Sequence, residues 1–274
     1  MEHDLANFAP ARTAFAVGWL TILLLWESAQ PFFGYFRGRA GERASHGAKN
    51  LLVGGINLLA TALGFAVLWA WAAGVAGEAR FGLLHAAGLP PWLHLAGAIV
   101  ILDFWMYWWH RLNHRLPILW RFHRTHHSDP RMDVTTASRF HLGEIVISSC
   151  LRTAVIFAAG IRLWDLAVYE TILFVIVQSH HANIVLPEPL DRALRVVVVT
   201  PSMHKVHHSR VLAETNSNYT SILSVWDRLF GTFRLNRNPQ SLQYGVDALD
   251  RPEDQTLVGL FRIPFLNRGG QRES

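Results

Sequence analysis

The sequence predicts an all-α fold, a multi-pass membrane bundle of about four to five hydrophobic segments. Hydrophobic residues make up 51% of the 274 residues and the mean hydropathy is +0.19, which is more apolar material than one soluble core of this length needs. The apolar residues fall in long runs, and the basic residues lie mostly between those runs. The chain has no internal repeat and no low-complexity linker, so residues 1–274 are predicted to form one membrane domain.

Three apolar runs are long enough to cross a bilayer, whose hydrocarbon core requires about 20 helical residues. They cover residues 13–33, 51–76 and 91–109, which we predict to be transmembrane helices. The second run has no charged side chain. The third ends in a cluster of tryptophans, as expected where a helix meets the lipid headgroups.

A fourth apolar region, residues 143–179, is interrupted at Gly160, Arg162 and Asp165. We predict a membrane helical hairpin here, because two shorter apolar stretches flank the interruption. A hairpin returns the chain to the side on which it started. The histidine-rich segments before and after it therefore face the same compartment.

The linker between the first two spans, residues 34–50, is expected to be a loop with four basic side chains and one acid. The linker over residues 77–91 has one basic and one acidic residue. The positive-inside rule then places the first linker, and the histidine-rich segments with it, in the cytoplasm. Anionic lipid headgroups account for the net charge of +5 better than nucleic acid does, so no nucleic-acid partner is expected.

Three histidine motifs follow the third span. Histidines three or four residues apart on a helix share one face, with β-carbons about 5–6 Å apart, which suits two imidazoles that hold one metal ion. Adjacent histidines diverge by about 100°, so an HxxHH motif can serve two ions. Eight imidazoles exceed the four ligands of one zinc ion, which predicts two metal ions. The motifs are HxxxH at His110 and His114, HxxHH at His123, His126 and His127, and HxxHH at His204, His207 and His208.

The order of these motifs among apolar spans resembles the fatty acid hydroxylase and sterol desaturase superfamily. The likeness covers residues 103–233 as a catalytic region. It rests on the histidine motifs with their flanking residues and on the strings at residues 139–144 and 226–233. One departure is Leu142, where the family string commonly carries proline.

The resemblance implies a non-haem di-iron centre, two iron ions that use dioxygen to hydroxylate, desaturate or demethylate a lipid such as a fatty acyl chain or a sterol. It also implies one further single histidine ligand, which matches His181, with His180 as the alternative. His141 and Glu144 are possible ligands or supports of a ligand, and Asn183 is a possible neighbour. The implied metal ligands are His110, His114, His123, His126, His127, His181, His204, His207 and His208.

Electrons for such an oxidation have to come from outside the chain. Cys150 is the only cysteine, so the chain cannot hold an iron–sulfur cluster with four thiolates. We expect a donor of the ferredoxin, rubredoxin or cytochrome type and a lipid substrate from the membrane. The protein would lie in the inner membrane if bacterial and in the endoplasmic reticulum if eukaryotic, with its histidine site on the cytoplasmic side.

An alternative function class is a divalent-metal transporter or sensor without oxygenase activity. Transporters place their ion ligands near the middle of the membrane, whereas these motifs lie at the ends of the spans, which favours the enzyme. The remaining histidines fall outside the family pattern and are assigned no chemistry. Among them is His46, whose replacement by alanine is therefore expected to leave activity and metal content unchanged.

Overall fold

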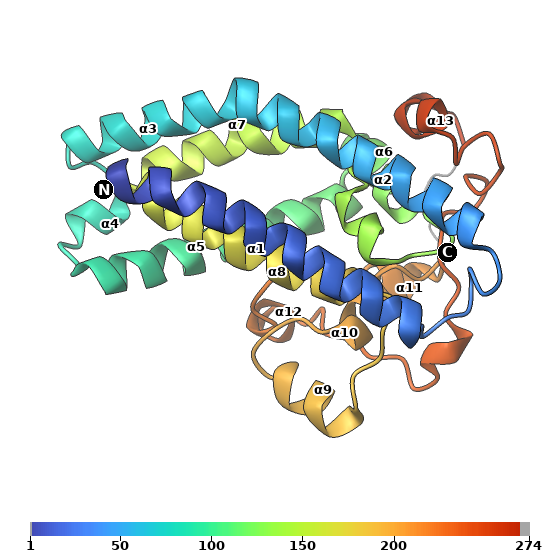
Figure 1. Cartoon of the computed structure of the whole chain (residues 1–274). Coiled ribbons are helices and arrows are strands. Elements are labelled where there is room, and N and C mark those ends of the chain that lie inside the picture. Colours follow the sequence, from blue (N-terminus) through green and yellow to red (C-terminus); the bar gives the residue numbers. More distant parts are fainter. Residues whose placement is uncertain (1, 269–274) are drawn as a thin grey trace.

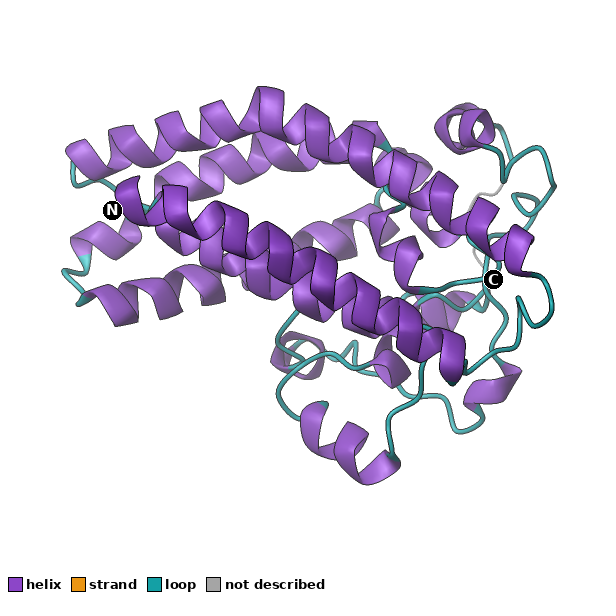
Figure 2. Cartoon of the chain, viewed as in Figure 1, coloured by secondary structure: helices purple, strands orange, loops and turns teal. Residues whose placement is uncertain are grey.

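The computed structural model describes residues 2–268. Within this range the regular secondary structure is helical throughout, as Figure 2 shows. Long helices lie side by side in an elongated bundle, and short helices gather at one end of it (Figure 1). This confirms the predicted all-α class. The short helices after the bundle are α9 (Glu188–Leu194), α10 (Pro201–His207), α11 (Leu212–Thr215), α12 (Val225–Leu229) and α13 (Leu257–Arg262).

The first two long helices meet at the end of the bundle where the short helices lie. Helix α1 (Glu2–Ala29) ends shortly before Pro31, which restricts the residue ahead of it. Helix α2 (Ala40–Ala60) then continues through one π-helical turn, η1 (Thr61–Phe65), into α3 (Ala66–Glu78). The prediction of a loop over residues 34–50 was wrong from residue 40 onward. Alanine, glutamate, arginine and lysine in this stretch favour a helix, which the linker's polar composition concealed.

The next two helices meet at a sharp corner. After the short α4 (Leu83–Ala86), α5 (Pro91–Arg115) and α6 (Pro117–His127) are separated by Leu116 alone. Leu116 is extended, with φ −96° and ψ 118°, as a residue before proline prefers, and Pro117 starts the new helix. The HxxxH motif therefore lies at the end of α5, and the first HxxHH motif lies at the end of α6.

The predicted hairpin consists of α7 (Leu142–Ala159) and α8 (Leu163–His181). Gly160 ends α7 in the left-handed conformation, with φ 71°, and a β-carbon there would lie 2.8 Å from the carbonyl oxygen of Phe81. Helix α7 packs against α3, whereas α8 packs against α1 and α5. An ion pair between Arg152 and Glu170 joins the two helices.

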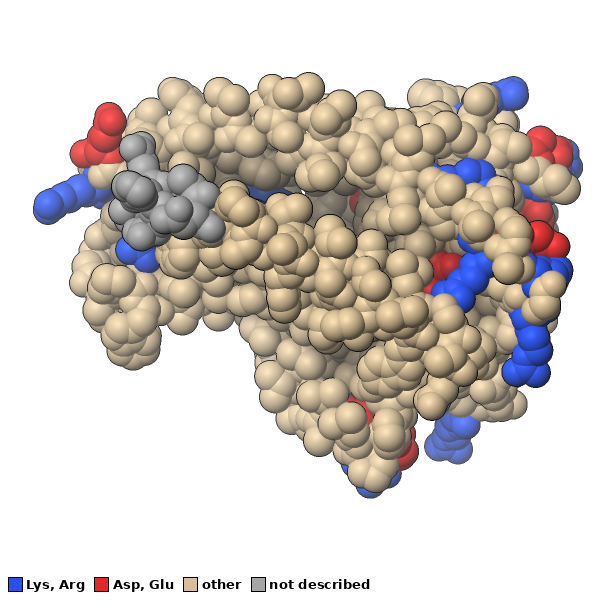
Figure 3. All heavy atoms as spheres, viewed as in Figure 1, with Lys and Arg blue, Asp and Glu red and all other residues tan. Residues whose placement is uncertain are grey.

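Three helical runs are long and apolar enough to cross a membrane: Phe8–Ala29, Ala40–Ala86 and Leu142–Ala159. Helices α5 and α8 are not among them, and their crossing of the bilayer stays a prediction. Large apolar side chains face outward along the bundle, as a lipid environment requires; Leu63, for example, is 76% exposed. Figure 3 shows a long flank almost free of charged side chains, with basic and acidic residues towards both ends.

Candidate metal centre

The histidine motifs converge at the end of the bundle where α5 ends and α6 and α10 lie (Figure 1). Nine histidines form two groups, and within each group the nitrogen atoms that can bind a metal lie within 4.8 Å of one another. These are the nine histidines that the resemblance implied as ligands. The five-histidine group contains His110, His114, His123, His127 and His207. The four-histidine group contains His126, His181, His204 and His208.

Each HxxHH motif contributes to both groups. On α6, His123 and His127 belong to the five-histidine group, while His126 points into the other. In the second motif His207 is separated in the same way from His204 and His208. The divergence of adjacent side chains on a helix produces this division.

Backbone carbonyls fix the tautomer of several rings. The Nδ1 atom of His110 lies 2.7 Å from the carbonyl oxygen of Tyr219, and that of His207 lies 2.7 Å from the carbonyl oxygen of Ser217. The Nδ1 atom of His181 lies 2.8 Å from the carbonyl oxygen of Val177. Because a carbonyl oxygen only accepts, Nδ1 carries the proton in each ring, and Nε2 presents a lone pair to the centre of its group.

The Nε2 atoms crowd together within each group. In the four-histidine group, Nε2 of His181 lies 3.1 Å from Nε2 of His126 and 3.0 Å from Nε2 of His204. The Nε2 atoms of His127 and His207 are buried and have no hydrogen-bond partner within residues 2–268. Buried polar atoms in proteins rarely lack a hydrogen-bond partner. Two converging sets of imidazole lone pairs fit two metal ions.

Burial also keeps these rings neutral. It lowers the pKa of His181 and of His207 to about 3. It holds the pKa values of His126, His204 and His208 well below their usual range, and the neighbouring imidazoles lower them further. Neutral imidazole is the form that binds metal ions.

The other predicted site residues lie around the groups. Glu144 Oε1 lies 3.0 Å from Nδ1 of His123 and accepts a hydrogen bond from Asn113, so it supports a histidine, which is one of the roles that the sequence left open. His141 lies outside both groups: its Nδ1 accepts a hydrogen bond from the backbone N–H of Gly143 at the start of α7. The ring of His180 lies tilted against that of His204, with centroids 3.9 Å apart, but His180 is also in neither group.

Asn183 and Lys205 position the segment after His181. The Asn183 side chain donates to the carbonyl oxygen of Phe33 and accepts from its backbone N–H, both at 2.9 Å, and does not reach either group. Lys205 is buried and donates to the carbonyl oxygens of Ala182 and Ile184 at 3.0 and 2.8 Å. Burial lowers the pKa of Lys205 to about 7. These contacts attach the end of α8 to α10.

The sequence assigned no chemistry to His46, and the structure gives its ring a structural contact that the sequence did not reveal. His46 lies on α2, not in a loop, and its buried ring makes contacts of 2.9 Å to Asp129 and 3.3 Å to Asp133. Asn50, one turn further along α2, donates to Thr135 at 3.0 Å. The spacing of polar residues at positions 46, 50 and 57, which share one helical face, was the signal that could have revealed this buried face.

Asp129 is the centre of this network. Burial by itself would raise its pKa, but the charges of His46 and Arg139 hold the pKa of Asp129 well below its usual range. Asp129 also accepts a hydrogen bond from Thr136 at 2.7 Å. Because Asp129 follows His127 by two residues, the network fixes the loop that leaves the first HxxHH motif.

Comparison with known proteins identifies the family. The sequence model of the fatty acid hydroxylase family matches residues 95–232. Ornithine lipid hydroxylase OlsE of Rhizobium tropici is 32% identical over 236 residues, which cover 83% of this chain and 68% of the relative. No solved structure matches the chain.

Other relatives are similar over a smaller part of their length. Alkylglycerol monooxygenase of Homo sapiens is 29% identical over 157 residues, which cover 57% of this chain and 33% of the relative. Fatty acid hydroxylase vlmA of Lecanicillium sp is 31% identical over 181 residues, 59% of this chain and 49% of the relative. Because the matched region covers half of the chain and contains every histidine of both groups, this protein belongs to the fatty acid hydroxylase family.

Proposed function

We propose that this protein is an integral-membrane di-iron oxygenase that uses dioxygen to hydroxylate a C–H bond of a lipid. The observation that carries the proposal is the pair of buried, neutral histidine groups at the end of an apolar helical bundle. The relatives are named as hydroxylases and monooxygenases of lipids, which favours hydroxylation over desaturation or demethylation.

The two histidine groups would hold the metal ions, five ligands in one group and four in the other. Imidazole nitrogen also suits zinc, copper and nickel, so the choice of iron rests on family membership. When bound, the iron pair would supply the activation of dioxygen. The chain itself orients the rings: Glu144 and the carbonyl oxygens of Tyr219 and Ser217 hold the Nδ1 protons, which directs each Nε2 inward.

Electron supply follows from the balance of the reaction. Insertion of one oxygen atom into a C–H bond and reduction of the other to water consumes two electrons and two protons. With a single cysteine and no thiolate cluster, the chain requires an external donor of the ferredoxin, rubredoxin or cytochrome type. The basic linker at the histidine end supports a cytoplasmic site, in the inner membrane if bacterial or the endoplasmic reticulum if eukaryotic.

A divalent-metal transporter has less support. The histidine groups lie at the end of the bundle, whereas transporters place their ion sites near mid-membrane between discontinuous helices. The three relatives named above carry the names of oxidising enzymes.

The test is anaerobic purification of the full chain in detergent, metal quantification, and mass spectrometry of lipids from an expressing host grown under ¹⁸O₂. We expect about two iron ions per chain and a lipid that gains one ¹⁸O atom. The matched control is His85→Ala, on α4 at the opposite end of the bundle. Less than one iron per chain with no labelled lipid would refute the proposal.

A further inference from the structure

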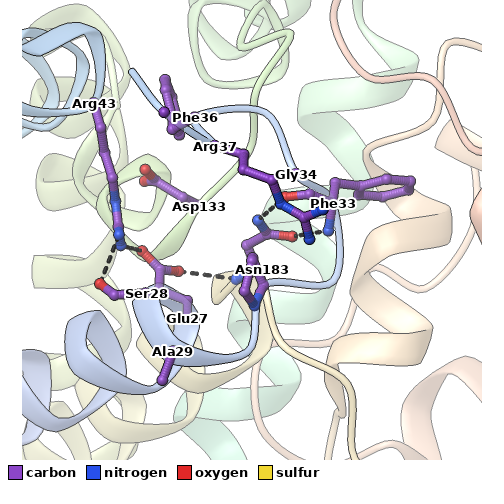
Figure 4. A pocket seen from close by; sticks show the side chains of 12 residues that line it. Glu27, Ser28, Ala29, Phe33, Gly34, Phe36, Arg37, Arg43, Asp133 and Asn183 are labelled. Atoms are coloured by element: carbon purple, nitrogen blue, oxygen red, sulfur yellow. Dashed lines mark hydrogen bonds and ion pairs between the residues drawn. The ribbon is translucent and has the colours of Figure 1, made fainter. Parts of the chain in front are cut away.

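A pocket of about 340 Å³ opens between the end of α1 and the start of α2 (Figure 4). It lies in the linker between two helical runs that are long and apolar enough to cross the membrane, Phe8–Ala29 and Ala40–Ala86. A linker at this position lies at the depth of the lipid headgroups. The pocket is at the same end of the bundle as the histidine groups (Figure 1).

Four charged side chains line the pocket, and three of them already have hydrogen-bond or ion-pair partners within the protein. Glu27 pairs with Arg43 at 2.9 Å and accepts hydrogen bonds from the backbone N–H groups of Val134 and Asn183, each at 3.0 Å. Asp133 accepts from the backbone N–H of Thr135 at 2.8 Å and also faces His46. Glu27 and Arg43 therefore compensate each other's charge, and Asp133 is held by a backbone N–H and by His46.

Arg37 is the exception. Its side chain is exposed, and its guanidinium makes no hydrogen bond or ion pair with any residue in the described range 2–268. Figure 4 shows Arg37 and Arg43 on different sides of the pocket. The lining holds two acids and two arginines, so its formal charges balance. The charge of Arg37 is the one that no described protein group meets.

One lining residue of the pocket is a near neighbour in sequence of a histidine of the four-histidine group. Asn183 lines the pocket and its side chain holds Phe33, another lining residue. His181 precedes Asn183 by two residues, and two residues span at most about 7 Å between α-carbons. The pocket and the four-histidine group thus share the short backbone segment from His181 to Asn183.

We propose that this pocket binds the anionic headgroup, a phosphate or carboxylate, of a membrane lipid, with Arg37 as its charge partner. That the bound lipid is the substrate rests on the proposed function; the binding itself does not. A planar guanidinium presents two parallel N–H donors to such an anion. The pocket sets the substrate class as lipids with a negatively charged head.

The binding test uses the full chain in phosphatidylcholine nanodiscs, titrated with phosphatidylglycerol and followed by native mass spectrometry. We expect Arg37→Gln to weaken binding of the first phosphatidylglycerol about tenfold, as loss of a hydrogen-bonded charge does. Arg37→Lys should retain part of the affinity. The matched control is Arg39→Gln, whose side chain pairs with Glu42 outside the pocket.

Three outcomes would overturn the proposal. One is an unchanged affinity of Arg37→Gln. Another is an equal loss in Arg39→Gln, which would indicate general surface attraction. The third is displacement of the lipid by inorganic phosphate at comparable concentration, which would make the pocket a site for free anions.

A second variant tests the volume of the pocket and leaves its charge intact. A β-carbon added at Gly34 would meet only the Arg37 side chain, at 3.8 Å or more, so Gly34→Leu should fold and fill the space. It should reduce phosphatidylglycerol binding, whereas Gly41→Leu, where an added β-carbon meets nothing within 4 Å, should not. Equal binding by both variants would contradict the proposal.

Turnover separates this proposal from the oxygenase assignment. If Arg37→Gln loses lipid binding but the unaltered protein oxidises no lipid, the pocket stands and the proposed function fails. If the unaltered protein is active and Arg37→Gln raises KM for an anionic lipid without lowering kcat, both stand. If the unaltered protein is active and Arg37→Gln leaves KM unchanged, the headgroup pocket is refuted and the oxygenase assignment is not.

Discussion

Glu144 Oε1 lies 3.0 Å from Nδ1 of His123, and this contact joins the start of α7 to a ring of the five-histidine group. The carboxylate holds the Nδ1 proton and so directs Nε2 of His123 toward His110, 3.1 Å away. Carboxylates in this position raise the basicity of a ligand and fix its orientation.

We predict that Glu144→Ala lowers metal affinity and hydroxylation roughly 10- to 100-fold, the usual cost of removing such a partner. Glu144→Gln keeps an oxygen acceptor and should recover much of the loss. Metal content after dialysis and lipid turnover measure the two effects. Equal behaviour of the alanine and glutamine variants would show that the contact does not orient His123.

His126→Ala and His207→Ala each remove one proposed ligand, from different groups. We expect each variant to lose at least one iron ion per chain and to have no measurable hydroxylation, because the chemistry would need both ions. Metal quantification of the purified variants checks this. Full activity in either one would refute the ligand set, and His141→Ala, outside both groups, should keep its metal.

His46→Ala leaves Asp129 buried, with Arg139 as its remaining charged partner at 3.8 Å. We predict a loss of about 3 kcal/mol in the free energy of unfolding. Thermal unfolding in detergent should show a Tm lower by roughly 5–10 °C. A Tm equal to that of the unaltered protein would show that the contact between His46 and Asp129 does not stabilise the fold.

Arg152 and Glu170 form a largely buried pair between α7 and α8. Replacing Arg152 alone with methionine should destabilise the protein by about 3–5 kcal/mol, because it leaves Glu170 unpaired among apolar helices. Replacing Glu170 with leucine as well should restore most of that stability. Unfolding measurements on the two single variants and the double variant test the coupling; additive effects would argue against it.

The sequence predicted the helical class, since periodicity and apolar length are local properties. Motif spacing singled out eight of the histidines that the fold brings together, and the family resemblance added His181. The sequence did not predict that α2 begins at Ala40, because polar residues such as His46 and Asn50 resemble a loop until their inward-facing partners are known. The choice of His181 over His180 for the four-histidine group depends on how the last turn of α8 is rotated. Pairings such as His46 with Asp129 join residues 83 apart, which no local pattern reveals.

Both HxxHH motifs supply histidines to both groups. If the groups hold two ions as proposed, a first ion would fix α6 and α10, which also carry histidines of the other group, so a second ion would meet a pre-arranged set of donors. Uptake should then be cooperative, and half-loaded chains should be scarce during a metal titration. If the proposed function holds, the protein would exist mainly in two populations, empty and fully loaded, and a cell short of iron would hold fewer working copies instead of many impaired ones.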